Sequence, residues 1–322
     1  MNIFTFKMAV CLGICLSLHV FVYAQPGPAG EVRKIISSGK QYFMNAEWSP
    51  DGERFAFSRK KFNGIWVSNA RGDSIRQITS DRSAGFGYQW SPGGQSLLAR
   101  PVVIREGKRH HQIKLYEVES PEEKLLLPAS REIQRLPVWI NGGREVAVKE
   151  KDRIKRVSTG KSSVKSHSSG QSVGMSFGGS LVAVPRDGLK STRQVVFPEF
   201  EGRYIFNSRI SPDGKKVVFQ VSGLGLFAAR IDGTQKRHLG HGEDASWMPD
   251  SRYVVVTKVA DDGHRITSGN LFAVDTRTGE YFPLLAHQDI IALKPSVSPD
   301  GDRVLFNDPR SGDIYMMKIS NR

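Results

Sequence analysis

One short turn motif occurs seven times in this chain, and its spacing constrains the fold more than any other feature. The three best copies begin at Trp48, Ile210 and Val297, and each continues Ser-Pro-Asp-Gly. Weaker copies begin at Trp90, Trp139, Met175 and Trp247. Successive copies start 35 to 50 residues apart, and a self-similar period of about 40–45 residues is typical of propeller blades.

Each copy has the composition of a tight turn between two strands. Pro presets φ near about −65°, Asp accepts local backbone N–H groups, and Gly supplies the positive φ that closes a hairpin. Apolar or alternating runs of strand composition follow, as in residues 54–58, 64–67, 75–79, 216–219, 225–228, 269–274 and 303–306. We therefore predict an all-β, seven-bladed β-propeller built from four-stranded antiparallel blades.

Two details of the repeat bear on blade number and closure. The copy at Met175 is the weakest, and a six-bladed propeller, which omits it, is the alternative. The last copy supplies only three strands, whereas residues 32–36 precede the first motif as residues 75–79 precede the second. We predict that residues 32–36 pair outside residues 314–319, so that an N-terminal strand closes the ring.

The order of turn motif, Phe/Val strand, Ile-Trp-Val and Arg-Gln-Ile-Thr resembles the TolB-type β-propeller repeat, a WD40-like repeat. The same repeat occurs in the propellers of prolyl-oligopeptidase-like enzymes and of oligogalacturonate lyases. The resemblance covers about residues 31–320 and is specific for the repeat rather than for an activity. It implies a central channel, with ligands or partners bound at one face of the propeller.

Residues 1–24 have the composition of a signal peptide. Lys7 supplies the positive charge, residues 8–22 form an apolar core, and Ala24 ends a small-x-small site. We expect cleavage after Ala24, which leaves residues 25–322 as a single propeller domain in the periplasm or outside the cell. A membrane anchor and a lipoprotein are the alternatives. Both cysteines lie within this segment, so the mature chain would contain no disulfide.

The formal net charge of +14 favours anionic partners. Nothing in the sequence resembles a nucleic-acid-binding module. We expect a protein or an anionic glycan as partner, no nucleic acid, no stable membrane span after cleavage, and a monomer. Residues 170–174 match the nucleophile-elbow string, but the expected structure around Ser172 is a polar loop followed by a strand. Because that motif requires a strand followed by a helix, we assign no catalytic residue.

The histidines collect on one predicted face. In a four-stranded blade, the loops between the second and third strands open on the same side as the loops that lead to the next blade. The ligand-binding residues predicted on this face are Arg105, His110, His111, His241, His264 and His287. No pair of them has the tight spacing of a zinc motif. We expect no cofactor, with a divalent metal as the alternative, and we assign no metal ligands.

Two classes of function are consistent with these patterns. The first is a non-catalytic module that binds a protein or a glycan through the histidine-bearing face. The alternative is a metal-dependent lyase, or a similar enzyme, acting on an acidic polysaccharide at the channel mouth. A broad apolar or aromatic-rimmed mouth would favour the binding module, and a cluster of His, Gln and Arg would favour the enzyme.

Overall fold

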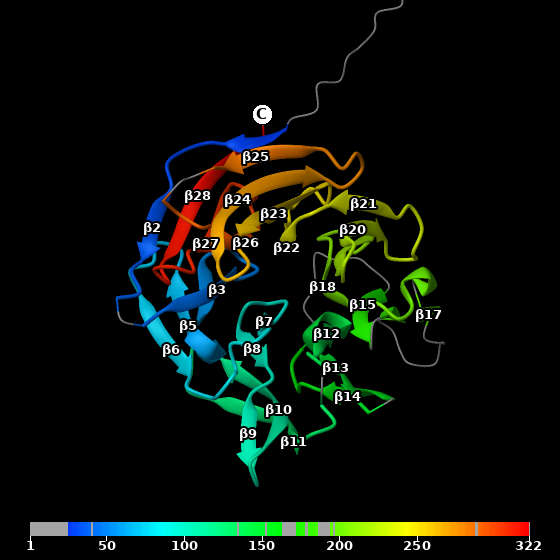
Figure 1. The fold of residues 1–322 in the computed structure, drawn as a ribbon. Coiled ribbons are helices and arrows are strands. Elements are labelled where there is room, and N and C mark those ends of the chain that lie inside the picture. The colour runs from blue at the N-terminus through cyan, green and yellow to red at the C-terminus, as the bar shows by residue number, and fades with distance from the viewer. Residues whose placement is uncertain are drawn as a thin grey trace, which may run out of the picture.

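A computed structural model gives the architecture of the chain. It describes residues 25–39, 41–133, 135–151, 153–162, 172–177, 180–185, 194–195, 197–286 and 289–321; for residues 172–195 within these ranges, only the backbone is described. The regular elements in these ranges are strands and three single-turn 3₁₀ helices, namely η1 (Lys60–Phe62), η2 (Asn141–Gly143) and η3 (Pro198–Phe200). The sheets stand around a common central axis (Figure 1).

The strands form seven antiparallel sheets, taken here in chain order. The first contains β3 (Phe43–Trp48), β4 (Arg54–Arg59), β5 (Asn63–Asn69) and β6 (Ile75–Thr79). The second contains β7 (Gln89–Trp90), β8 (Ser96–Ala99), β10 (Lys108–Glu117) and β11 (Glu123–Ser130), with β9 (Val102–Arg105) paired to the start of β10. The third contains β12 (Val138–Ile140), β13 (Glu145–Glu150) and β14 (Arg153–Ser158), and the fourth contains β15 (Ser172–Phe177), β16 (Ser180–Pro185) and β17 (Gln194–Val195).

Three more sheets complete the ring. The fifth contains β18 (Ile205–Ile210), β19 (Lys216–Val221), β20 (Gly225–Arg230) and β21 (Arg237–Gly240). The sixth contains β22 (Glu243–Trp247), β23 (Tyr253–Asp261), β24 (Ile266–Asp275) and β25 (Tyr281–Leu285). The seventh contains β26 (Leu293–Val297), β27 (Arg303–Asn307) and β28 (Ile314–Asn321), and β28 also pairs with β1 (Pro26–Pro28) and β2 (Arg33–Ile36).

The predicted all-β propeller is confirmed. The third and fourth sheets have three strands each within the described ranges, where we expected four. The blade count agrees with our alternative of six rather than with the seven blades that we predicted first, although the described strands form seven sheets, of which β15–β17 ends in a two-residue strand.

The predicted closure of the ring by an N-terminal strand is confirmed. Arg33 pairs with Met316 and Ile36 pairs with Ile314, so β2 covers the outer edge of β28. The Lys34 ammonium lies 2.7 Å from the Asp313 carboxylate, which also accepts the Ser38 N–H at 2.8 Å. Burial alone would raise the pKa of Asp313, but these hydrogen bonds outweigh it and lower the pKa below its usual value.

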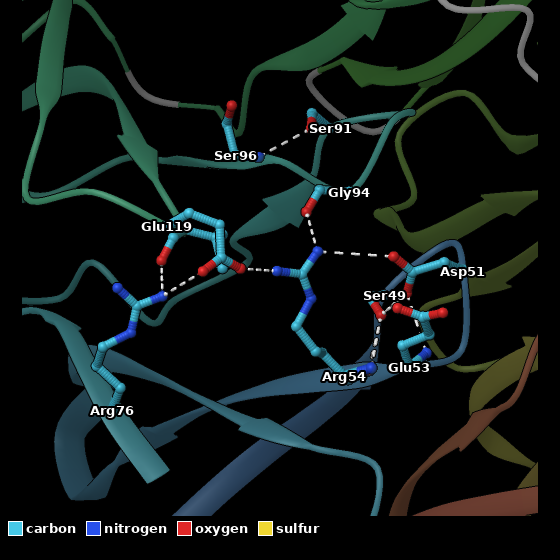
Figure 2. A network of polar contacts seen from close by, with 10 residues as sticks. Ser49, Asp51, Glu53, Arg54, Arg76, Ser91, Gly94, Ser96 and Glu119 are labelled. Atoms are coloured by element: carbon cyan, nitrogen blue, oxygen red, sulfur yellow. Dashed lines mark hydrogen bonds and ion pairs between the residues drawn. The ribbon is translucent and has the colours of Figure 1, made fainter. Parts of the chain in front are cut away.

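The repeated turn has the geometry that its composition predicts. Gly52 has φ of 72°, and its N–H donates to the Ser49 carbonyl oxygen at 3.0 Å. The Ser49 hydroxyl accepts the Arg54 N–H at 3.0 Å, and the equivalent bond joins Ser91 and Ser96 (Figure 2). In these turns, and in those at Ser211 and Ser298, the serine hydroxyl satisfies the first donor of the following strand.

Cations that follow the turn join neighbouring sheets. The Arg54 guanidinium donates to the Gly94 carbonyl oxygen at 3.2 Å and pairs with Glu119, both in the second sheet (Figure 2). In the same way, the Lys216 ammonium donates to the Ser251 carbonyl oxygen at 2.8 Å, from the fifth sheet to the sixth. These contacts between neighbouring sheets stabilise the end of the propeller that carries the repeated turns.

The hydrophobic core lies between adjacent sheets rather than within one layer. One cluster joins Phe55, Phe57 and Trp66 of the first sheet to Leu305 and Ile314 of the seventh. Others join the first sheet to the second, the second to the third, the fifth to the sixth, and the sixth to the seventh. Because every such cluster needs two sheets, a blade cannot bury its own apolar faces alone.

No helix in the described part of the chain has the length and apolar character needed to cross a bilayer.

Candidate functional site at the channel mouth

Three predicted site residues lie on the β9–β10 hairpin of the second sheet. Arg105 ends β9, is exposed, and pairs with Lys108 across the hairpin. His110 and His111 lie in the first half of β10 and are half-buried, and His110 Nδ1 lies 3.2 Å from the Lys108 carbonyl oxygen. The β9–β10 hairpin therefore places Arg105, His110 and His111 away from β7, the first strand of the second sheet.

His111 has an unusual environment. Burial, together with the positive charges of Arg100 and Arg109, lowers the pKa of its imidazole to about 4. The ring is therefore neutral at neutral pH. Its Nδ1 is buried, and within the described ranges it has no hydrogen-bond partner.

Two further predicted residues lie on the sixth sheet. His241 is exposed, lies two residues before the start of β22, and accepts a hydrogen bond from the Tyr281 hydroxyl on its carbonyl oxygen at 3.0 Å. His264 is exposed in the turn of the β23–β24 hairpin, where its N–H donates to Asp262 at 2.9 Å. That hairpin continues four residues past Thr257, which pairs with Glu243, and four strand residues span about 13 Å. The His264 turn therefore lies well beyond the level at which β22 begins.

The remaining predicted residue, His287, lies outside the described residues. Among the residues that are described, no group of three or more His, Cys, Asp or Glu side chains could hold a metal ion. The described predicted histidines belong to the second and sixth sheets, which are not neighbours in the ring. The structure therefore does not bring them together, and their role in ligand binding stays a prediction.

The first strand of each sheet places its own side chains, rather than the predicted histidines, at the central axis. Within this inner ring, β18 contacts β22, β22 contacts β26, and β26 contacts β3. Four inner strands break their pairing register at one place, three residues before the start of the turn motif. The residues with positive φ at this place are Asn45, Asn207, Asp244 and Lys294. Each is a β-bulge, a feature common at rims and next to sites.

The bulge leaves two consecutive residues facing solvent. In β18, both Phe206 and Asn207 are exposed, although strict alternation would bury one of them. Side chains at the two equivalent positions of the other inner strands are also exposed or half-buried. We call the residues at these two positions, four and three before each motif copy, the channel mouth; its described members are Met44, Asn45, Phe86, Gly87, Arg135, Leu136, Phe206, Asn207, Glu243, Asp244, Leu293 and Lys294.

Aromatic side chains rim the channel mouth. Phe86 is 43% exposed, Phe206 is 41% exposed and Tyr204, directly before β18, is 65% exposed. The Phe62 ring, from η1, stands edge-on to Phe86 with ring centroids 5.1 Å apart. Phe62 and Phe86 form one pair, from the first and second sheets, and Tyr204 and Phe206 come from the fifth sheet. Large apolar side chains exposed at one end of a rigid scaffold are typical of a binding surface.

The charged groups of the mouth are mostly engaged with one another. The Lys294 ammonium pairs with the Asp244 carboxylate, which also accepts the Asn207 amide at 3.3 Å. Burial and the neighbouring Asp244 raise the pKa of Glu243 above its usual value. This part of the rim therefore links the fifth, sixth and seventh sheets through polar contacts.

Below the mouth, one ion pair crosses the axis. The Arg209 guanidinium of β18 lies 2.7 Å from the Glu47 carboxylate of β3. These strands stand on opposite sides of the axis, with β22 and β26 between them on one side of the ring (Figure 1). The side chains remain 52% and 27% exposed, respectively. The pair therefore forms an accessible polar floor beneath an aromatic rim.

Two tryptophans of the turn motif hold the backbone on both sides of this floor. The Trp90 indole N–H donates to the Glu47 carbonyl oxygen at 3.1 Å, and the Trp247 indole N–H donates to the Arg209 carbonyl oxygen at 2.9 Å. Each bond runs between neighbouring sheets. The backbone at Glu47 and at Arg209 is thus held in place by hydrogen bonds from the neighbouring sheets.

A signal for these residues was present in the sequence. Relative to the first residue of each motif copy, the bulge residue stands three positions before and the floor residue one position before. The rim phenylalanines stand four positions before Trp90 and Ile210. These positions, compared across all copies, indicate the channel mouth, whereas residue type alone indicates the histidines in the outer loops.

Comparison with solved structures supports the architecture. A crystal structure of oligogalacturonate lyase from Vibrio parahaemolyticus is 15% identical and covers 92% of this chain and 97% of its own, with a TM-score of 0.61. The Cps50 (Swd1) β-propeller domain from Myceliophteria thermophila is 11% identical, covering 90% and 100%, also at 0.61. A putative TolB from Agrobacterium tumefaciens is 17% identical, covering 86% and 90%, at 0.52.

No protein-family model matches the sequence, and no curated protein matches it. At these identities, the structural similarities show the fold. The chain is thus a β-propeller that carries a repeated Ser-Pro-Asp-Gly turn and a bulged inner ring. Together with the predicted repeat, the comparisons identify a TolB-like β-propeller fold.

Proposed function

We propose that this protein is an exported, non-catalytic binding module that engages a protein or glycan partner through its channel mouth. The observation that carries the proposal is the aromatic rim formed by Phe62, Phe86, Tyr204 and Phe206. An aromatic-rimmed mouth is the feature that distinguishes a binding face from a catalytic cluster of His, Gln and Arg. Rigid aromatic side chains also contribute large contact areas at little entropic cost.

The neighbouring framework supports a recognition role. The rim stands on strands whose backbone is held by indole hydrogen bonds and by bulges, so little ordering is needed on binding. Loops of different length surround it, including the long β23–β24 hairpin. Variable loops on a rigid scaffold are where binding function usually resides.

Site-specific photo-crosslinking tests the proposal. A photoreactive phenylalanine analogue at Phe206 should form adducts with one dominant partner in living cells, while the same analogue at Ile75, exposed on the outer strand β6, should not. A panel of immobilised neutral and acidic glycans covers the other partner class. Equal labelling from both positions, together with no glycan retained, would show that the mouth is not the binding face.

Two alanine variants refine the test. Phe86→Ala and Phe206→Ala should each weaken partner binding by about tenfold or more, because aromatic anchors at the centre of an interface contribute most of its free energy. Leu125→Ala, at a side chain 50% exposed on the outer strand β11, is the matched control. Unchanged affinity in both phenylalanine variants would contradict the proposal.

The enzymatic alternative is tested with the same protein. Purified protein incubated with polygalacturonate and added Mn²⁺ or Ca²⁺ should release no unsaturated oligosaccharides if the binding module is correct. Metal-dependent product formation that is lost in His241→Ala and His287→Ala would establish the lyase.

Export of a single domain spanning residues 25–322, with cleavage after Ala24, is part of the proposal. In its support, an apolar core at residues 8–22 follows Lys7, and Ala24 ends a small-x-small site. Mass spectrometry of protein from the native host should find Gln25 at the N-terminus, in a periplasmic or extracellular fraction. Intact Met1 in a cytoplasmic fraction would refute export.

A further inference from the structure

We propose that Glu47 pairs with Arg209 in the unliganded protein and competes there with a ligand. The carboxylate of an apolar peptide segment that enters the channel mouth displaces Glu47 and binds Arg209. This inference rests on the proposed function, because it names the chemistry that the binding face selects. It adds a competing group within the chain and one recognition residue, Arg209.

The position of the ion pair is the first argument. Arg209 and Glu47 meet across the axis directly below the rim, one layer deeper than Asn45 and Asn207 on the same strands. A group that passes Phe206 and enters along the axis meets this pair next. The Arg209 side chain is 52% exposed although protein atoms surround it on all sides, so an incoming group must reach it along the axis.

The strength of the ion pair is the second argument. Ion pairs between solvent-exposed side chains contribute little to stability, typically below about 1 kcal/mol. This guanidinium carries five N–H donors; within the described ranges it donates one hydrogen bond, from Arg209 Nη2 to Glu47 Oε1, and the Asp244 carboxylate also acts on it electrostatically. A carboxylate in bidentate geometry would form a stronger contact than the single bond it replaces.

The preorganised backbone is the third argument. Trp247 and Trp90 hold the carbonyl oxygens of Arg209 and Glu47 from neighbouring sheets. Displacing Glu47 therefore requires only a rotation of its side chain. The guanidinium stays where it is, so the cost of ordering it for a ligand is small.

The charges of the inner strands select the kind of anion. Among the described residues of the channel mouth and the floor, the acids are Glu47, Glu243 and Asp244, and the bases are Arg135, Arg209 and Lys294. Lys294 already pairs with Asp244. A polyuronate would bring several carboxylates against three acids, which like-charge repulsion disfavours. A single carboxylate on an apolar peptide segment matches one guanidinium below an aromatic rim.

The test uses a minimal peptide on the purified protein. Acetyl-Ala-Ala-Phe with a free C-terminal carboxylate is the probe, and the same peptide with a C-terminal amide is its uncharged control. Trigalacturonate serves as the acidic-sugar arm. Affinities are measured by ligand-observed NMR for the wild type and for Glu47→Gln, Glu47→Ala and Arg209→Gln. Arg71→Gln, which breaks the exposed Arg71–Asp73 ion pair on the β5–β6 turn, is the matched control.

Opposite effects are expected from the two partners. Both Glu47 variants should bind the carboxylate peptide up to about fivefold more tightly, the factor that corresponds to removing an exposed ion pair. Arg209→Gln should bind it at least about tenfold more weakly, because a charge-assisted hydrogen bond is lost. Arg71→Gln should match the wild type. The amide peptide should not distinguish the variants, and trigalacturonate should bind more weakly than the carboxylate peptide throughout.

Several results would overturn the inference. Weaker or unchanged peptide binding in both Glu47 variants would show that Glu47 does not compete for Arg209. Wild-type affinity in Arg209→Gln, or tighter binding of trigalacturonate than of the peptide, would show that the selected chemistry is wrong. If the peptide affinity depends on Phe86 and Phe206 but not on the ion pair, Glu47 does not compete for Arg209, although the channel mouth remains the binding face. Loss of dependence on those phenylalanines as well would refute both.

Discussion

The clearest quantitative prediction concerns the strand that closes the ring. Ile36 lies in β2, is 3% exposed, and packs in the cluster that contains Phe43, Leu305 and Ile314. Ile36→Ala removes three carbon atoms, which corresponds to about 2.4 kcal/mol of lost transfer free energy. A cavity left between two sheets adds to this, so we expect a destabilisation of about 3–4 kcal/mol.

The corresponding change in melting temperature follows from chain size. With an unfolding entropy of about 2.1 cal/mol/K per residue, a propeller of about 300 residues loses about 1.6 °C for each kcal/mol. Ile36→Ala should therefore lower Tm by about 5–6 °C in differential scanning calorimetry. Urea unfolding should show a lower midpoint with an unchanged m-value, because the same surface is exposed on unfolding.

Ile75→Ala is the matched control. Ile75 occupies the outer strand of the first sheet, as Ile36 occupies the outermost position of the seventh, but its side chain is 48% exposed. This variant should change stability by less than about 0.5 kcal/mol and Tm by less than about 1 °C. If both substitutions produce equal shifts, or if Ile36→Ala costs less than about 1 kcal/mol, β2 does not close the core in the way described.

Three further outcomes are expected. Because the pKa of Asp313 is lowered in the folded state, its carboxylate stabilises the fold above the unfolded-state pKa of about 3.9, and this stability is lost as pH falls through the lowered folded-state pKa. In urea unfolding, the difference in stability between Asp313→Asn and the wild type should be full at pH 7 and should shrink steadily as pH falls below about 3.9. Gly72 has φ of 82°, and an added Cβ would overlap the Ile35 carbonyl group of β2. Gly72→Ala should therefore lower the free energy of unfolding by more than about 2 kcal/mol in thermal unfolding. Gly27 has open space around it, so Gly27→Ala should be nearly neutral. An NMR titration of the His111 imidazole should give a midpoint near 4; a midpoint near the ordinary value of about 6.5 would contradict its buried, cation-flanked environment.

The repeat made most of the fold predictable because one turn chemistry recurs at each inner hairpin. Ser251 illustrates why this held even in a weak copy, since it replaces the usual glycine yet still adopts φ of 54°. By contrast, β1 was not expected. Its sequence, Pro26-Gly27-Pro28, has no strand signal, and it pairs only as an addition to the outer edge of β28, where proline is tolerated.

The candidate site was less accessible to prediction because its residues are common types in unremarkable positions. Phe206 and Asn207 face solvent together only because a bulge interrupts the alternation of β18. The Arg209–Glu47 contact joins residues 162 positions apart, and no local pattern indicates which inner strands stand opposite each other. The histidines attracted attention through their chemistry, yet the structure spreads those it describes over separate sheets.

Because β2 pairs with β28, the ring can close only after β28 has been synthesised. Arg33 and Met316 are about 280 residues apart in sequence, and closing a loop of that length costs about 5 kcal/mol of chain entropy. During translation, β2 is made early but must wait unpaired until β28 exists, leaving open strand edges that favour misassembly. Folding of this propeller should therefore have a late, slow closing step, whereas an open repeat array can begin to fold at any of its units.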